Sequence, residues 1–403
     1  MTLARSLRYL IWTDDGLHAL RAPCVRTPRL AREFQFENLL QYCPRLLPLT
    51  EIKMPMKRLW IQCLSILAVA LLALPAHAGG DLSILSWEGY ADASFVKPFE
   101  RSTGCRVSAT YVGSNDEFIA KIIAGGGAYD LITPSNDTTM RLIDAGAVEP
   151  IDTNKIPAMK DFFPIFVSPP WLAKNGATYG VPYGWGIVRL LLDADVGLGT
   201  PDSLAYLWQP KLKGKVSIWD DVEAIYMASR YLGYKNTYDL TDDQLQKVKA
   251  ALLALKPNIR KYWATTGEMG TLMQTREIVA GNAWEPTLVS LRKSGRHIID
   301  VVPKEGRSAY SDSWMVANGA GSNPCVYQWL NWVSTPKAQA MAHAVTGFGY
   351  SNAKMPAELG PPDRARYEGL GMADPRIIKT LDWWQLVKRR GKYLEIWNQV
   401  KAR

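Results

Sequence analysis

Residues 82–133 read LSILSWEGYADASFVKPFERSTGCRVSATYVGSNDEFIAKIIAGGGAYDLIT, a stretch in which short apolar runs alternate with amphipathic ones. The hydrophobic period predicts five elements in turn: a strand at 82–87, a helix at 93–103, a strand at 107–112, a helix at 115–124 and a strand at 129–133. This alternation indicates the α/β class, with a mostly parallel sheet flanked by helices. Because ligands bind at the carboxyl ends of the strands in such sheets, we expect a site formed by residues 87–90 and 134–137.

A second α/β region follows an irregular, proline-rich segment at 147–182. Its pattern predicts a strand at 215–219, helices at 222–231 and 241–255, a strand ending at 283, a helix at 287–294 and a strand at 297–302. Thr241 and Gln244 have the spacing of a capping box at the start of the second of these helices. Helices are also predicted near 323–333 and 336–345.

Residues 56–78 contain the three parts of a secretory signal peptide in their proper order. Met56-Lys57-Arg58 is a basic start, residues 61–74 are apolar, and Ala76-His77-Ala78 is a small-residue cleavage site. The apolar run is too short for a comfortable transmembrane helix, and an internal core helix is the alternative. We therefore expect export to the periplasm, with cleavage after Ala78.

A signal peptide must lead the chain that it exports, so residues 1–55 need an explanation of their own. We expect translation to start at Met54 or Met56, which would leave the upstream residues untranslated. An unusually long extension is the alternative.

Charge and cysteine usage narrow the function classes. The net charge is +9, but residues 1–78 hold ten Lys and Arg against five Asp and Glu, so more than half of the excess lies there. The rest of the chain has no basic stripe with interleaved aromatic residues, and no nucleic-acid partner is predicted. Without a Cys-x-x-Cys motif or a histidine pair at metal spacing, we expect no metal site and no cofactor.

Cys105 and Cys325 are the two cysteines that follow the predicted cleavage site. In an oxidising compartment two cysteines can pair, whereas two buried free thiols are the alternative. We expect a disulfide between them.

Fifteen tryptophans are a high number for 403 residues, and several lie beside acidic residues at predicted strand ends. These pairs are Trp87-Glu88, Trp219-Asp220-Asp221, Trp284-Glu285, and Asp312 close to Trp314. Aromatic faces attract an alkylammonium group through cation–π interaction, and carboxylates accept its charge-assisted hydrogen bonds. Core packing for the tryptophans and helix N-terminal charges for the carboxylates remain the alternative.

Six short segments carry a resemblance to a known family. They are SWEGY at 86–90, GAYDL at 127–131, VPYGWG at 181–186, LWQP at 207–210, YLGY at 231–234 and DVVPKEG at 300–306. In order and spacing they resemble the spermidine/putrescine-binding periplasmic proteins of polyamine ABC importers, and the similarity runs from about residue 82 to 401.

This resemblance implies the type II periplasmic binding protein fold, in which two α/β lobes enclose the ligand in a cleft between them. The first lobe would hold residues 79–188 and 311–355, and the second residues 189–310 and 356–403. It also implies a monomer that binds a small cationic amine, delivers it to an ABC transporter permease in the inner membrane, and catalyses no reaction.

Positions that hold the polyamine in the family match Trp87, Tyr90, Ser135, Trp284, Tyr310, Asp312 and Gln385. An acidic pair of the family falls near Asp221 and Glu223, with Asp220 as an alternative. From their places beside these residues, Glu88, Asp137 and Glu285 join the expected site.

Two departures from the family pattern concern the ligand. Gly89 stands where the family commonly has an acidic residue, and Asp137 stands where it has an aromatic one. We therefore expect a different amine, which is shorter, singly charged or quaternary.

Two other readings remain open. Another solute, such as an amino-acid-derived cation or an iron(III) complex, is the first, although no adjacent tyrosine pair of the kind that favours iron is present. A secreted α/β hydrolase or transferase is the second. His297 and His343 are the histidines that follow residue 78, and no G-x-S-x-G motif is present, which argues against an enzyme.

Overall fold

The computed structural model describes residues 79–124, 128–197, 199 and 201–402, together with two earlier strands, β1 (Arg8–Thr13) and β2 (Gly16–Arg21). The two strands pair antiparallel with each other. The chain divides into two units, Met1–Pro75 and Ala76–Arg403, and both large sheets belong to the second. The predicted signal peptide at 56–78 lies outside the described residues.

The first large sheet has eight strands in the order β16-β9-β15-β5-β3-β4, with β6 and β17 also paired to β15. Their bounds are β3 (Asp81–Ser86), β4 (Arg106–Tyr111), β5 (Leu131–Ile132), β6 (Val148–Glu149), β9 (Val181–Ile187), β15 (Ser308–Ala317), β16 (Gly349–Tyr350) and β17 (Asp382–Trp383). Strands β3, β4 and β5 are parallel, as their connections through helices require. Strand β15 runs antiparallel to β5 and β9, because it returns from the second sheet.

The second large sheet has five strands in the order β12-β11-β13-β10-β14. Their bounds are β10 (Arg189–Asp193), β11 (Val216–Trp219), β12 (Ile259–Trp263), β13 (Ala280–Ala283) and β14 (Ile298–Val301). Strand β11 is parallel to β12 and β13, whereas β10 is antiparallel to β13 and β14. Each sheet is thus parallel in its helix-connected part and antiparallel where a strand crosses over from the other sheet.

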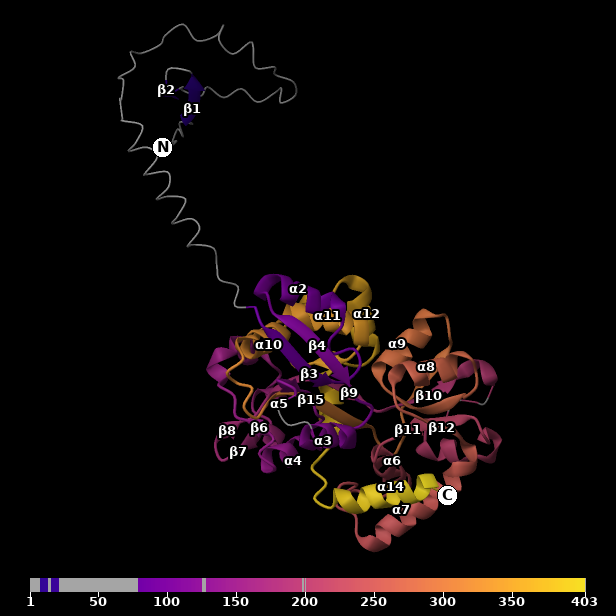
Figure 1. The fold of residues 1–403 in the computed structure, drawn as a ribbon. Helices are drawn as coiled ribbons and strands as arrows, with labels where there is room; N and C mark the ends of the chain where they lie inside the picture. The colour runs from indigo at the N-terminus through magenta and orange to yellow at the C-terminus, as the bar shows by residue number, and fades with distance from the viewer. Residues whose placement is uncertain are drawn as a thin grey trace. The chain divides into compact units, whose positions relative to one another are not determined.

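Helices cover both faces of each sheet, as expected for this class (Figure 1). Around the first sheet lie α2 (Ala93–Thr103), α3 (Asn115–Ala124), α4 (Thr139–Asp144), α5 (Pro164–Val167), α10 (Pro324–Ser334), α11 (Pro336–Thr346) and α12 (Pro361–Gly369). Around the second lie α6 (Glu223–Tyr231), α7 (Asp242–Leu255), α8 (Thr266–Gln274), α9 (Glu285–Lys293) and α14 (Arg390–Ala402), and α13 (Pro375–Thr380) precedes β17. A small hairpin is formed by β7 (Ala173–Lys174) and β8 (Ala177–Thr178).

Local signals in the sequence set the ends of these helices. Asp92 accepts a hydrogen bond from the Ser94 N–H before α2, and Gly104 ends this helix in the left-handed conformation at φ 76°. The predicted capping box of Thr241 and Gln244 is confirmed at the start of α7. In the described part of the chain, no helix combines the length and the hydropathy that a bilayer-spanning segment needs.

Two short connections carry the chain from one large sheet to the other. Val188 alone separates β9 from β10, and residues 302–307 join β14 to β15. Every residue of β9 and of β15 is buried. The segment after residue 356 touches both sheets, since α12 packs on α11 through Arg366 and Tyr367, whereas α14 lies against α7.

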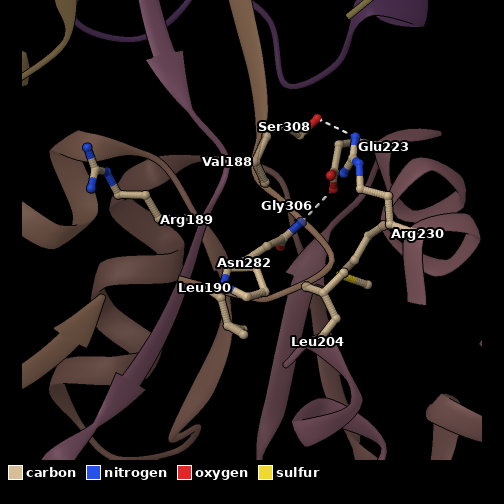
Figure 2. Close-up of a pocket in the computed structure, with 11 residues that line it drawn as sticks. Val188, Arg189, Leu190, Leu204, Glu223, Arg230, Asn282, Gly306 and Ser308 are labelled. Atoms are coloured by element: carbon tan, nitrogen blue, oxygen red, sulfur yellow. Dashed lines mark hydrogen bonds between the residues drawn. The ribbon is translucent and has the colours of Figure 1, made fainter. Parts of the chain in front are cut away.

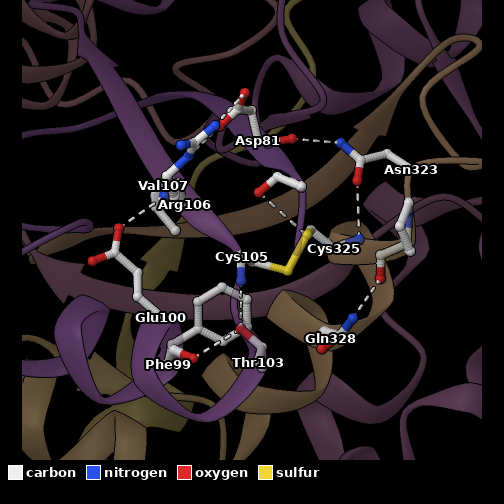
Figure 3. Close-up of a disulfide and its surroundings, with 12 residues drawn as sticks. Asp81, Phe99, Glu100, Thr103, Cys105, Arg106, Val107, Asn323, Cys325 and Gln328 are labelled. Atoms are coloured by element: carbon white, nitrogen blue, oxygen red, sulfur yellow. Dashed lines mark hydrogen bonds and ion pairs between the residues drawn. A yellow bond between two sulfur atoms is a disulfide. The ribbon is translucent and has the colours of Figure 1, made fainter. Parts of the chain in front are cut away.

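A disulfide links the end of α2 to the start of α10 (Figure 3). The Cα atoms of Cys105 and Cys325 are 6.0 Å apart, and the bond closes a sequence separation of 220 residues. Asn323 caps α10 by accepting from the Cys325 N–H at 2.9 Å, and its amide donates to the Asp81 carbonyl at 2.9 Å. The bridge therefore joins two elements of the first sheet at the end opposite the predicted binding edge.

Candidate functional site

Three tryptophans end parallel strands of the second sheet. Trp219 and Trp263 are the last residues of β11 and β12, and Trp284 directly follows β13. The Trp219 and Trp284 ring centroids are 5.0 Å apart, and those of Trp263 and Trp284 are 5.7 Å apart. The carboxyl ends of these strands therefore meet in one aromatic wall, at the edge where ligands bind in parallel α/β sheets.

Rings from the rest of the chain close this wall. The Trp384 ring is parallel to Trp219 within 9° at 6.1 Å, and Tyr310 of β15 lies 5.1 Å from Trp284. From the first sheet, Trp87 approaches Trp219 at 6.3 Å. We call these six residues, Trp87, Trp219, Trp263, Trp284, Tyr310 and Trp384, the aromatic cluster.

Two glycines of β9 make room for tyrosines at the cluster. A Cβ atom on Gly184 would come within 2.1 Å of the Tyr90 hydroxyl oxygen, and one on Gly186 within 2.4 Å of the Tyr310 hydroxyl oxygen. Side chains at these positions are excluded by this close approach. Close packing of the two tyrosines therefore explains the two glycines of the VPYGWG segment.

Asp312 is the carboxylate at the centre of the expected site. Tyr90 and Ser135 each donate a hydroxyl hydrogen bond to it at 2.6 Å, and its side chain is buried. Burial raises the pKa of Asp312 to about 7, against the lowering effect of these two hydrogen bonds. Among the described residues, no Lys, Arg or His lies within ion-pair distance of this carboxylate.

Trp87 completes the surroundings of Asp312. Its buried indole N–H lies near enough to Asp312 to lower the pKa of that carboxyl, although it does not meet the geometry of a full hydrogen bond. Six residues of the expected site therefore lie in one connected group: Trp87, Tyr90, Ser135, Trp284, Tyr310 and Asp312.

Asp137 and Asp221 meet a different partner, the guanidinium of Arg390. Arg390 donates to Asp137 at 2.8 Å and to Asp116 at 3.0 and 3.1 Å, and lies 3.6 Å from Asp221. Tyr226 also donates to Asp137, at 3.0 Å. Asp116 is on α3 and Asp137 follows β5, whereas Asp221 and Arg390 belong to the second sheet and its helices, so this guanidinium joins the two halves.

Charge and burial oppose each other in this group. Burial lowers the pKa of Arg390, but Asp137 and the other neighbouring groups raise it well above its ordinary value, so the guanidinium stays charged. The pKa of Asp221 is raised to about 7 by burial, which outweighs the lowering effect of Arg390. Asp220, the alternative to Asp221, accepts instead from Trp397 and Lys401 near the end of α14.

Glu285 is bound by a cation of its own. It accepts from the Arg189 guanidinium at 3.0 Å and from the Ile187 N–H at 2.9 Å, and its side chain is fully buried. Tyr310 also donates to this carboxylate, at 3.4 Å.

Glu223 lines a cavity together with Asn282 and Arg230 (Figure 2). One of its oxygens accepts from Asn282 at 2.6 Å, and the other is buried without a hydrogen-bond partner. Burial raises the pKa of Glu223 to about 8, and the charge of Arg230 acts in the opposite direction. The cavity is lined by Val188, Arg189, Leu190, Leu204, Glu223, Met227, Arg230, Asn282, Pro303, Gly306 and Ser308.

Glu88 and Gln385 lie apart from this group. Glu88 is exposed and accepts from Thr266 at 2.8 Å, which is a surface contact between the loop after β3 and α8. Gln385 is exposed, while the preceding Trp384 is buried in the aromatic cluster.

Sequence reasoning missed Trp263, Trp384 and Arg390. Asn136 positions Trp384 by donating to its carbonyl at 2.7 Å, and the Trp384 indole donates to Ser308 at 2.7 Å. Trp384 directly precedes Gln385, the residue that was matched to a ligand-holding position of the family. Shifting that match by one residue would have identified Trp384. No local signal marked Arg390, since its partners are distant in sequence.

Comparison with known proteins gives a consistent picture. The model of the family of bacterial extracellular solute-binding proteins matches residues 94–369. The spermidine/putrescine-binding periplasmic protein of Escherichia coli (strain K12) is 26% identical over 344 residues, which cover 83% of this chain and 96% of that protein. The putrescine-binding periplasmic protein PotF of the same organism is 28% identical over 337 residues, covering 75% and 90%.

A solved structure shows the shared fold. A Listeria monocytogenes protein described as a spermidine/putrescine ABC transporter superimposes with a TM-score of 0.73 at 22% identity, covering 80% of this chain and 99% of that one. The two-lobed periplasmic binding protein fold is thereby confirmed for the described part of the chain.

Proposed function

The chain belongs to the family of bacterial extracellular solute-binding proteins, and on that basis we propose that it is the receptor of an ABC importer for a small organic amine in its cationic form. This is a family of transport receptors and not of enzymes. The relatives named above bind spermidine and putrescine, or putrescine, according to their names.

The observation that carries the proposal is the position of Asp312 against the aromatic cluster. A buried carboxylate without a cationic partner is costly, and an incoming ammonium group would supply the missing charge. Tyr90 and Ser135 hold the carboxylate in place, while Trp87 offers a ring face for cation–π attraction. The methylene groups of an alkylamine would pack on the remaining rings of the cluster.

Binding would draw the two sheets together around the ligand. Trp87 and Asp312 come from the first sheet, and Trp219 and Trp284 come from the second, so a ligand between them would contact both. The division into lobes 79–188 with 311–355 and 189–310 with 356–403 remains part of this proposal. Val188 and residues 302–307 would be the hinge, because they are the short connections between the sheets.

The same proposal covers localisation and partners. The chain would be exported by its predicted signal peptide at 56–78, work in the periplasm as a monomer, and deliver its ligand to a permease in the inner membrane. The disulfide between Cys105 and Cys325 is compatible with an oxidising compartment.

A ligand screen tests the proposal. Protein purified from the periplasmic fraction is melted with butylamine, putrescine, spermidine, a betaine and glutamate, and each hit is titrated by calorimetry. An amine at a hundred times its dissociation constant should add about 2.7 kcal/mol to the free energy of unfolding, and it should be recovered unchanged. A melting temperature that responds to glutamate and to none of the amines would contradict a cation receptor.

A further inference from the structure

Arg390 holds the acidic groups at one end of the candidate site. Its guanidinium contacts Asp116, Asp137 and Asp221, and it also lies 3.3 Å from the Tyr226 hydroxyl. Its side chain is 2% exposed. A buried guanidinium with several carboxylate partners is strongly held, because leaving any of these charges without its partner would cost several kcal/mol.

The charges at this end are close to balance without a ligand. Arg141 lies 3.7 Å from Asp116 and adds a second guanidinium to the group. Burial and the neighbouring carboxylates raise the pKa of Asp221 to about 7, so its negative charge is only partial at neutral pH. Two arginines therefore face three carboxylates, and burial raises the pKa of two of these, Asp137 and Asp221.

The other two buried carboxylates near the cluster each lack one feature of Asp312. Glu285 is paired with Arg189. Glu223 faces the cavity of Figure 2, whose walls include Arg189 and Arg230 but none of the aromatic cluster. Asp312 alone combines contact with the aromatic side of the site and the absence of a cationic partner among the described residues.

We propose that Arg390 acts as a built-in counter-cation that occupies the acidic end of the site, so that the protein selects ligands with a single ammonium group, bound at Asp312. This inference rests on the proposed function and deepens it, because it names the ligand class. An alkyl monoamine, or a quaternary amine with one charge, would place its cation at Asp312 and its apolar part along the rings. The second ammonium of a diamine would approach Arg390 and be repelled by it.

The first test compares two ligands of equal length in the wild-type protein. Butylamine and putrescine have the same four-carbon chain but carry one and two ammonium groups. Calorimetry at pH 8 should give a dissociation constant for putrescine at least tenfold higher than that for butylamine. Putrescine binding as tightly as butylamine, or more tightly, would overturn the inference and leave the proposed function standing. If neither of these two binds while another amine of the ligand screen does, the inference is overturned and the proposed function stands; if no amine binds, the proposed function fails.

The second test replaces Arg390. In Arg390→Met, the acidic end is left without its guanidinium, and the ratio of putrescine to butylamine affinity should rise at least tenfold. Arg366→Met is the matched control, since Arg366 is largely buried too, with 16% of its side chain exposed, but pairs with Asp363 on α12. If the role of Arg390 is purely structural, the folded variant should bind both amines more weakly by the same factor. An unchanged ratio of putrescine to butylamine affinity would therefore count against the inference. Should Arg390→Met fail to fold, the wild-type comparison still decides.

Discussion

Replacing Asp312 by asparagine should separate binding from folding. The carboxylate accepts two hydroxyl hydrogen bonds, from Tyr90 and Ser135, and has no cationic partner among the described residues. Asparagine keeps the shape and one acceptor oxygen but removes the charge. Affinity for an ammonium ligand should therefore fall, while the ligand-free protein should lose little stability.

The size of the effect follows from burial. A carboxylate and an ammonium about 4 Å apart attract each other by about 4 kcal/mol at an effective dielectric constant of about 20. Losing one partner of a buried, hydrogen-bonded charge pair costs about 2–5 kcal/mol. The dissociation constant of butylamine should thus rise by between about thirtyfold and several thousandfold.

The stability of the ligand-free protein should change little, because two effects of the substitution oppose each other. The pKa of Asp312 is raised to about 7 in the folded state and is about 3.9 in an unfolded chain. The ionised carboxylate is therefore unfavourable in the folded state above pH 7, and this cost vanishes as pH falls below 4. At pH 8 asparagine removes that cost but leaves one of the two hydroxyl donors facing its NH2 group, so the melting temperature without ligand should change little.

Calorimetry and thermal melting at pH 8 measure the two quantities. Asp130→Asn is the matched control, because Asp130 also accepts two uncharged hydrogen bonds, from the Ser83 N–H and the Asn323 amide, at the opposite end of β5. Its affinity for butylamine should equal that of the wild type. If Asp312→Asn binds butylamine like the wild type, Asp312 is not in the site and the cation proposal loses its main support.

Three further outcomes are expected. An ammonium ligand needs Asp312 in its ionised form, and burial, with a contribution from Asp137, raises the pKa of Asp312 to about 7. Affinity should therefore fall close to tenfold from pH 6 to pH 5, and Asp312→Asn should remove this dependence. Unreduced, denatured protein should show no free thiol at Cys105 or Cys325, and reduction should lower the free energy of unfolding by up to about 5 kcal/mol, so labelling of two thiols would refute the bond. Small-angle scattering should show compaction with saturating ligand, and an unchanged radius of gyration would argue against hinge closure at Val188 and 302–307.

The fold could be predicted well where local patterns determine it. The strands at 82–87 and 107–112 and the helix at 93–103 each matched the structure to within a few residues, because period and capping are properties of short segments. The antiparallel pairs of β15 with β5 and β9 had no such local signal. They depend on which way the chain enters each sheet after crossing from the other, which is a property of topology.

The candidate site divides along the same line. Trp87, Trp284 and Asp312 lie at strand ends or on a crossover strand, so their convergence follows from the rule that ligands bind at the carboxyl ends of parallel strands. Asp137 and Asp221 were also expected there, Asp137 from its place beside Ser135 and Asp221 from the family resemblance. Arg390, which is 253 residues from Asp137, reaches them only because α14 folds back over the second sheet. A carboxylate near a binding site can be assigned as a ligand contact only when the positions of all arginines and lysines that could reach it are known. The position of Arg390 depends on how α14 packs, which the sequence pattern does not give. Asp137, which departs from the family pattern, and Asp221, which matches it, therefore form one group with Arg390. Within this group the positive charge comes from the protein and not from a ligand.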